Sequence, residues 1–106
     1  MKKDDLLKLA EIAGKEHRSD DDGAMYLNDP RYTNHWTIPW LPHEDLNQAM
    51  ECLEALATEW DLFKTKDGLY NISILIGANP KDWQVFKGFD SLAIAICKAV
   101  LKAVRG

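Results

Sequence analysis

Hydrophobic side chains recur at helical spacing in three stretches of the chain. In residues 3–14 they lie three and four positions apart, and Asp4 and Gly14 are suited to begin and end a short helix. Residues 44–58 carry a longer apolar stripe, and Asp45 with a glutamine three residues later resembles a capping box. The pattern predicts two helices, whose apolar faces consist of Leu6, Leu9, Ala10 and Ala13, and of Leu46, Ala49, Met50, Leu53 and Leu56.

The third stretch, from Asp90 to the end of the sequence, is apolar on nearly every side. Asp90 is placed to cap this helix, and the helix has one charged stripe, made of Lys98, Lys102 and Arg105. The positive charge of its last turn complements the helix dipole. A helix this apolar is buried on most of its surface, so we expect it to cross a sheet and to contact another helix or a second subunit.

Between the second and third helices the hydrophobic pattern changes to alternation. Residues 60–66, the pair Asp67-Gly68 and residues 69–77 together predict a β-hairpin. Residues 83–88 predict a third short strand, which follows a turn. In the second strand of the hairpin one face is mixed and the other is apolar, so we expect the apolar face to pack on a core; that face consists of Tyr70, Ile72, Ile74 and Ile76.

Helices and strands in this order predict an α+β fold, with a small antiparallel sheet of three to four strands covered by about three helices, like an α/β/α sandwich. We expect the fourth strand within residues 32–40, where Pro39 confines it to a sheet edge or ends it. A chain of 106 residues predicts a single domain. Its expected parts are the N-terminal helix at about residues 3–14, a polar loop at 15–35 and a core at 36–105.

The composition is that of a folded domain and narrows the choice of partners. The apolar fraction is 46% and the charged fraction is 28%, and a formal charge of −4 makes DNA and RNA poor partners. Asp4 and Asp5 stand where a secretory signal would be apolar, and no apolar run is long enough to span a membrane. We therefore expect a cytoplasmic protein whose two cysteines, Cys52 and Cys97, are reduced and buried.

The segments PHEDLNQAMECLEAL and DSLAIAICKAVLKAV, with the alternating region between them, resemble the phage ABA-sandwich domain family. In that family the final helix tends to read A-I-C-x-A-x-L-x-A, which is matched here from Ala95 to Ala103. The resemblance spans about residues 36–104. It implies the fold and an origin in a phage or prophage genome, and hence the cytoplasm of a host cell. The family is mostly without an assigned function, so the resemblance implies no activity.

No motif in the sequence predicts catalysis or a bound metal. The histidines and cysteines lack the spacing of zinc ligands, and Asp20–Gly23 lacks the alternating ligands of a calcium loop. There is no GxSxG elbow and no P-loop, and both cysteines lie inside predicted helices rather than at their N-termini. We expect no cofactor, no metal and no enzymatic activity, because a catalytic pair such as His43 with Asp61 would have to be assembled from distant positions.

Residues 30–43 concentrate chemistry that the predicted helices and strands leave unused. The stretch PRYTNHWTIPWLPH holds three of the four prolines, two of the three histidines and two of the four tryptophans. Stacking rings beside hydrogen-bond donors suit a nucleobase and a phosphate, or a protein partner. Alternatively, the tryptophans close over the small core. The candidate ligand-binding residues, which include two lysines further along the chain, are Arg31, Tyr32, Asn34, His35, Trp36, Trp40, Lys81 and Lys87.

Two functions fit these observations. The first is a small phage-type accessory protein that binds a nucleotide-like small molecule or a host protein. By analogy with other small phage proteins, such a protein sequesters a nucleotide-derived immune signal of the host. The second is a structural or oligomeric phage protein that docks on a protein partner, because the apolar last helix needs to be buried. In both cases we expect a homo-oligomer, and neither a membrane nor a nucleic acid as partner.

Overall fold

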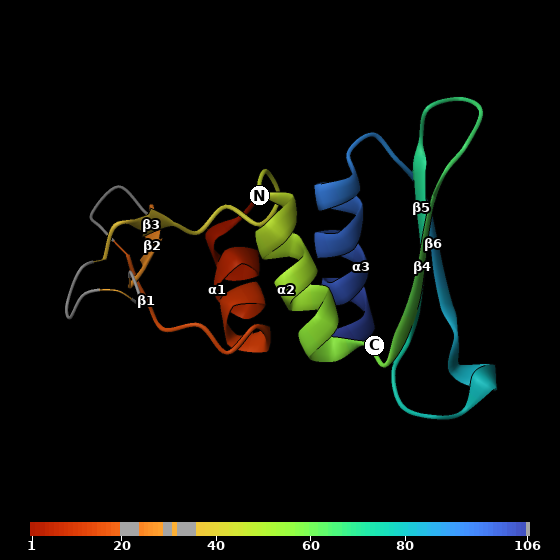
Figure 1. Ribbon diagram of the computed structural model, residues 1–106, viewed down its shortest axis with the longest axis horizontal. Helices are drawn as coiled ribbons and strands as arrows, with labels where there is room; N and C mark the ends of the chain where they lie inside the picture. Colours follow the sequence, from red (N-terminus) through yellow and green to blue (C-terminus); the bar gives the residue numbers. More distant parts are fainter. Residues whose placement is uncertain (20–23, 29–30, 32–35, 106) are drawn as a thin grey trace.

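The fold consists of two small antiparallel sheets with a layer of helices between them, as Figure 1 shows. The computed structural model describes residues 1–19, 24–28, 31 and 36–105. The predicted α+β class and the three predicted helices are confirmed. The helices form the middle layer, whereas in an α/β/α sandwich the sheet would lie there. The helices are α1 (Lys3–Ile12), α2 (Leu46–Leu56) and α3 (Leu92–Arg105).

The C-terminal sheet is formed by the predicted hairpin and the predicted third strand, in the order β4-β5-β6. Ile72 lies opposite Leu62 on one neighbour and Phe86 on the other, so apolar side chains line up across the face toward the helices. Ile72 and Ile74 are fully buried there. The pairing register of β5 with β4 and β6 therefore agrees with the alternation of apolar and polar residues in the sequence. The strands are β4 (Glu59–Lys64), β5 (Tyr70–Leu75) and β6 (Gln84–Phe89).

The N-terminal sheet lies where we expected mostly a polar loop, so that expectation is wrong for two short segments. Met25 and Leu27 are buried and the tyrosine between them is half-buried, but alternation over three residues is too short to predict a strand. The expected fourth strand exists, although it belongs to this second sheet, and Pro39 lies at the sheet edge as predicted. The strands are β1 (His17–Ser19), β2 (Met25–Leu27) and β3 (Ile38–Pro39).

Helix α3 buries most of its apolar surface within this chain. One side of α3 packs on β5 and β6, and its other sides contact α1 and α2. Ile96 and Val100 are fully buried in the shared core. The apolar character of α3 therefore requires no second subunit. None of the helices that the structure describes is long and apolar enough to cross a membrane.

Two of the three predicted helix caps differ from the expectation. The backbone N–H of Ile94 donates a hydrogen bond to Ser91 Oγ at 3.4 Å, so Ser91 caps α3 in place of Asp90. Helix α1 follows Lys2, whose side chain makes no capping bond, and Asp4 lies within its first turn. Asp45 caps α2 as predicted. Asp4 still stabilises α1 through the helix dipole, because a carboxylate in the first turn is favourable.

Candidate functional site

The predicted ligand-binding residues do not converge on one place. Lys81, in the short helix η1 (Pro80–Asp82), and Lys87, in β6, are exposed and belong to the region of the C-terminal sheet. Trp36 leads into β3, on the opposite side of the helix layer (Figure 1). Arg31 is exposed in a turn. Three further predicted residues fall outside the part of the chain that the structure describes: Tyr32, Asn34 and His35.

Trp40 belongs to the core and offers no face to a ligand, which corrects its place among the candidates. Its side chain is fully buried. The indole Nε1–H donates a hydrogen bond to the carbonyl of Leu6 at 2.9 Å, and the backbone N–H of Trp40 donates to the carbonyl of Met25 at 2.8 Å. Trp40 therefore joins α1 to the N-terminal sheet. Of the two open alternatives, core packing holds for this tryptophan.

Trp36 differs from Trp40, because it is only half-buried and its indole nitrogen has no partner in residues 1–19, 24–28, 31 and 36–105. The guanidinium carbon of Arg18 lies 4.7 Å from the centre of the Trp36 ring, which is a cation–π distance. The indole Nε1 is buried and makes no hydrogen bond with any described part of the chain. Arg18 was not predicted, since it lies in a three-residue strand within the stretch expected to be loop.

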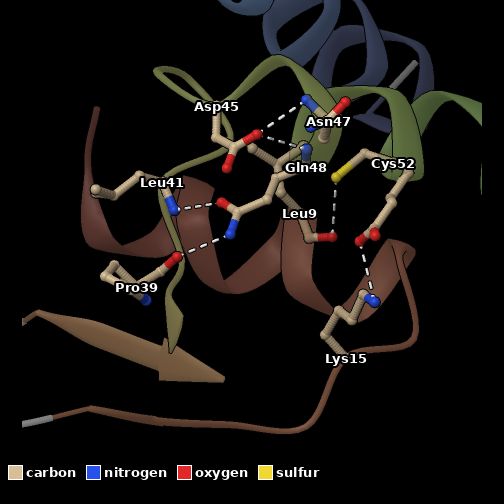
Figure 2. A network of polar contacts seen from close by, with 9 residues as sticks. Leu9, Lys15, Pro39, Leu41, Asp45, Asn47, Gln48 and Cys52 are labelled. Atoms are coloured by element: carbon tan, nitrogen blue, oxygen red, sulfur yellow. Dashed lines mark hydrogen bonds and ion pairs between the residues drawn. The ribbon is translucent and has the colours of Figure 1, made fainter. Parts of the chain in front are cut away.

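A hydrogen-bond network around Gln48 attaches the N-terminal sheet to α2, as Figure 2 shows. Gln48 Oε1 accepts from the backbone N–H of Leu41 at 2.7 Å, and Gln48 Nε2 donates to the carbonyl of Pro39 at 2.8 Å. Asp45 Oδ1 accepts from the backbone N–H groups of Asn47 and Gln48. The expected capping box is therefore only half formed, because the Gln48 side chain bonds the strand-to-helix connection instead of the cap residue.

A cavity of about 340 Å³ lies between the N-terminal sheet and the helices, beside this network. The ammonium of Lys15 forms an ion pair with the carboxylate of Glu51 at 3.0 Å in its wall (Figure 2). Arg18 and Trp36 each lie two residues along the chain from a lining residue, namely Glu16 and Ile38. The Arg18–Trp36 pair is therefore adjacent to the cavity, within the reach of two extended residues.

Neither cysteine is suited to nucleophilic or metal chemistry in the folded protein. Burial raises the pKa of both thiols from 9.0 to about 12, and the nearby carboxylate of Glu51 adds to the shift at Cys52. The Cys52 thiol donates to the carbonyl of Leu9 at 3.5 Å, so it is a packed, protonated group (Figure 2). Among the described residues no three histidine, cysteine, aspartate or glutamate side chains gather as metal ligands do. Asp20–Gly23 lies outside the described residues.

Comparison of the chain with protein-family models, with curated proteins and with solved structures found no match. The resemblance to the phage ABA-sandwich domain family therefore stays a prediction, and the site has to be judged on its own geometry.

Proposed function

We propose that this protein is a non-enzymatic binding protein that captures a nucleotide-like small molecule at the Arg18–Trp36 pair. One observation carries the proposal: the indole N–H of Trp36 is buried without an acceptor among the described residues, while a guanidinium group stacks on its ring. A buried donor without a partner costs free energy that an incoming acceptor recovers.

The chemistry of the pair matches a ligand that has both a planar ring and an anionic group. Trp36 is half-buried, so part of its ring remains accessible for stacking with a nucleobase. Arg18 is exposed, and no described carboxylate pairs with it. A guanidinium binds phosphate oxygens through two parallel hydrogen bonds. A base on Trp36 and a phosphate on Arg18 therefore use both groups.

The adjacent cavity offers room for the rest of such a ligand. Its volume of about 340 Å³ lies at the lower end of the range for small-molecule sites. Leu27 and Ile38 contribute apolar surface, and the Lys15–Glu51 pair contributes charge of both signs.

The biological setting that we propose follows from the final-helix signature between Ala95 and Ala103. Its resemblance to the phage ABA-sandwich domain family supports a phage accessory protein acting in the cytoplasm of the host. A nucleotide-derived immune signal of the host is the ligand class that fits this setting. Sequestration requires only tight binding, so no catalytic group has to be found.

A second function, docking on a protein partner or on another copy, is favoured by the outer face of the C-terminal sheet. Phe63 and Val85 are 51% and 54% exposed, and all three helices lie on the other side of this sheet (Figure 1). Exposed apolar side chains on an uncovered face are typical of interaction surfaces. Light scattering tests this alternative, and a monomer at high protein concentration would contradict the homo-oligomer.

Calorimetry on three matched proteins tests the ligand proposal. The wild type is titrated with AMP, cyclic dinucleotides, cyclic ADP-ribose isomers and inorganic phosphate, and we expect heat from at least one nucleotide. Trp36→Phe keeps a stacking ring but removes the N–H, so we expect about tenfold weaker binding, equivalent to roughly 1.4 kcal/mol. Trp83→Phe is the control, because that exposed tryptophan lies beside the C-terminal sheet, and its affinity is expected to stay at the wild-type value.

Three outcomes would contradict the proposal. No heat with any nucleotide excludes the ligand class. An unchanged affinity in Trp36→Phe, with circular dichroism showing an intact fold, excludes the site. Conversion of the bound nucleotide, detected by mass spectrometry after heat release, excludes a purely binding role.

A further inference from the structure

A second cavity of about 300 Å³ lies on another part of the molecule, between the start of α1, the approach to α2 and one side of α3. Ile94, Lys98 and Leu101 line it from α3, at the i, i+4, i+7 spacing of one helix face. His43 lines it from the segment before α2, and Lys2 from the residue before α1. This cavity shares no lining residue with the cavity beside Arg18 and Trp36.

The charges around this cavity favour an anion. Among the described lining residues Asp5 is the one with a carboxylate, and its Oδ1 accepts a hydrogen bond from Arg105 Nη2 at 2.6 Å. Lys2 and Lys98 form no ion pair with any described residue. Two unpaired ammonium groups therefore line one cavity of a protein whose net charge is −4. A carboxylate or phosphate entering this cavity meets a locally positive field.

His43 supplies a second, independent indication of a ligand. Its Nδ1 atom is buried and has no hydrogen-bond partner among the residues that the structure describes. Buried polar atoms in folded proteins almost always have a partner, so an unpartnered nitrogen in a side chain that lines a cavity favours a ligand that completes it. A protonated imidazole, or the tautomer with hydrogen on Nδ1, donates to an oxygen of an anion.

The remaining lining residues are apolar, so they favour an anion that also has an apolar part. Ile94, Leu101 and the side chain of Met1 line the cavity beside the two lysines. A bare inorganic ion would leave this apolar surface in contact with water, whereas a molecule with a hydrocarbon part would cover it. We propose that this cavity binds a small organic acid, whose carboxylate contacts Lys2, Lys98 and His43 and whose apolar body packs on Ile94 and Leu101.

Calorimetry with four probes separates the charged part of this recognition from its apolar part. The wild-type protein is titrated with hexanoate, with hexanol, which has the tail but no charge, and with acetate and inorganic phosphate, which have the charge but no tail. We expect hexanoate to bind at least tenfold more tightly than each of the other three. Hexanol or phosphate binding as tightly as hexanoate would overturn the proposal.

Two further measurements locate the site. Lys98→Met keeps the length of the side chain but removes the charge, and we expect at least tenfold weaker hexanoate binding. Lys102→Met is the matched control, because Lys102 is an exposed lysine of the same helix outside the cavity lining. The nitrogen resonance of His43 Nδ1 is expected to shift on saturation with hexanoate. Equal affinities of the two lysine variants, or an unmoved His43 resonance, would overturn the assignment. The hexanoate experiments do not depend on nucleotide binding at Trp36, because the two sites have different lining residues.

Discussion

The C-terminal sheet has three strands of six residues each, whereas the strands of the N-terminal sheet have three, three and two residues. Both sheets are antiparallel, and they lie on opposite sides of the helix layer, the N-terminal sheet beside α1 and the C-terminal sheet beside α3 (Figure 1). The C-terminal sheet is held by continuous strand pairing and by a row of buried isoleucines. A sheet as short as the N-terminal one is not stable by itself. It depends on side chains outside its strands, chiefly Gln48 and Trp40.

The difference in strand length between the two sheets indicates where a ligand is expected to bind. Regions with few hydrogen bonds between strands open locally at a low cost in free energy, and ligand-binding segments are often found in such regions. The unpartnered Trp36 N–H and the first cavity both lie beside the N-terminal sheet. In the C-terminal sheet the Oδ1 atom of the buried Asn71 has a partner, since it accepts from the backbone N–H of Gly88 at 3.0 Å. The weaker sheet therefore carries the candidate nucleotide site.

The largest expected effect is on the free energy of unfolding, and it compares how much buried core each sheet contributes. Ile72→Ala removes a fully buried side chain from the middle of the C-terminal sheet, and we expect a loss of about 4 kcal/mol of unfolding free energy. Ile38→Ala, on the half-buried edge strand of the other sheet, is expected to cost only about 1 kcal/mol. Urea denaturation measures both values. Equal losses would show that the N-terminal sheet contributes as much core as the C-terminal one.

The next effect tests how the N-terminal sheet is attached. Gln48→Leu leaves the Pro39 carbonyl and the Leu41 N–H without partners, so we expect a loss of about 2–3 kcal/mol. Amide hydrogen exchange is expected to accelerate first in β2, ahead of β5. Glu54→Gln, an exposed change in the same helix, is the control and is expected to leave stability within about 0.5 kcal/mol. Uniform acceleration across both sheets would contradict the idea of a separate attachment.

The dependence of stability on alkaline pH tests the burial of two thiols in the helix layer between the sheets. The pKa of the Cys52 and Cys97 thiols is raised from 9.0 to about 12 in the folded protein. Above pH 9 the unfolded chain loses these protons first, so the stabilisation is complete below pH 9 and is lost as the pH rises toward 12. We expect a fall of about 1 kcal/mol per thiol for each pH unit above 9.

The matched control for this titration is the double variant Cys52→Ala with Cys97→Ala. Its stability is expected to fall less steeply above pH 9, because the buried groups that titrate there have been removed. Denaturation curves at pH 8, 9 and 10 compare the two proteins. A slope shared by both would assign the alkaline loss to groups other than the thiols.

The smallest effect compares backbone strain on the two sides of the molecule. Gly14, at the exit of α1 toward β1, and Gly88, in β6, have φ angles of +68° and +83°. A Cβ atom would meet nothing within 4 Å at either position, so an alanine costs backbone strain alone. We expect each Gly→Ala change to cost about 1 kcal/mol. Unequal losses, measured by thermal unfolding, would show that one sheet tolerates the strain better.

Helices α2 and α3 and the C-terminal sheet were predicted from the sequence because their patterns are long. The apolar stripe of α2 and the alternation from Tyr70 to Ile76 each repeat over several residues, which is enough to predict the element. The burial departs from these patterns in places, because Leu46 at the start of the stripe is 44% exposed and Leu75 on the other face of β5 is buried. Strands of two or three residues show no repeat, so β1 and β2 were missed. The Asp45 cap was predicted because capping is local in sequence, whereas the role of Gln48 required knowledge of a strand nine residues away.

The sequence by itself determined the α+β class, the helical and alternating segments and most of the apolar positions that are buried. Only the tertiary structure decided which aromatic residues are core and which are accessible, since Trp36 and Trp40 lie four residues apart in one irregular segment. It placed Arg18 on Trp36, and it gathered Lys2, His43 and Lys98 around one cavity. The physical reason is that local periodicity records which side of a segment is buried, whereas a site depends on how distant segments pack together.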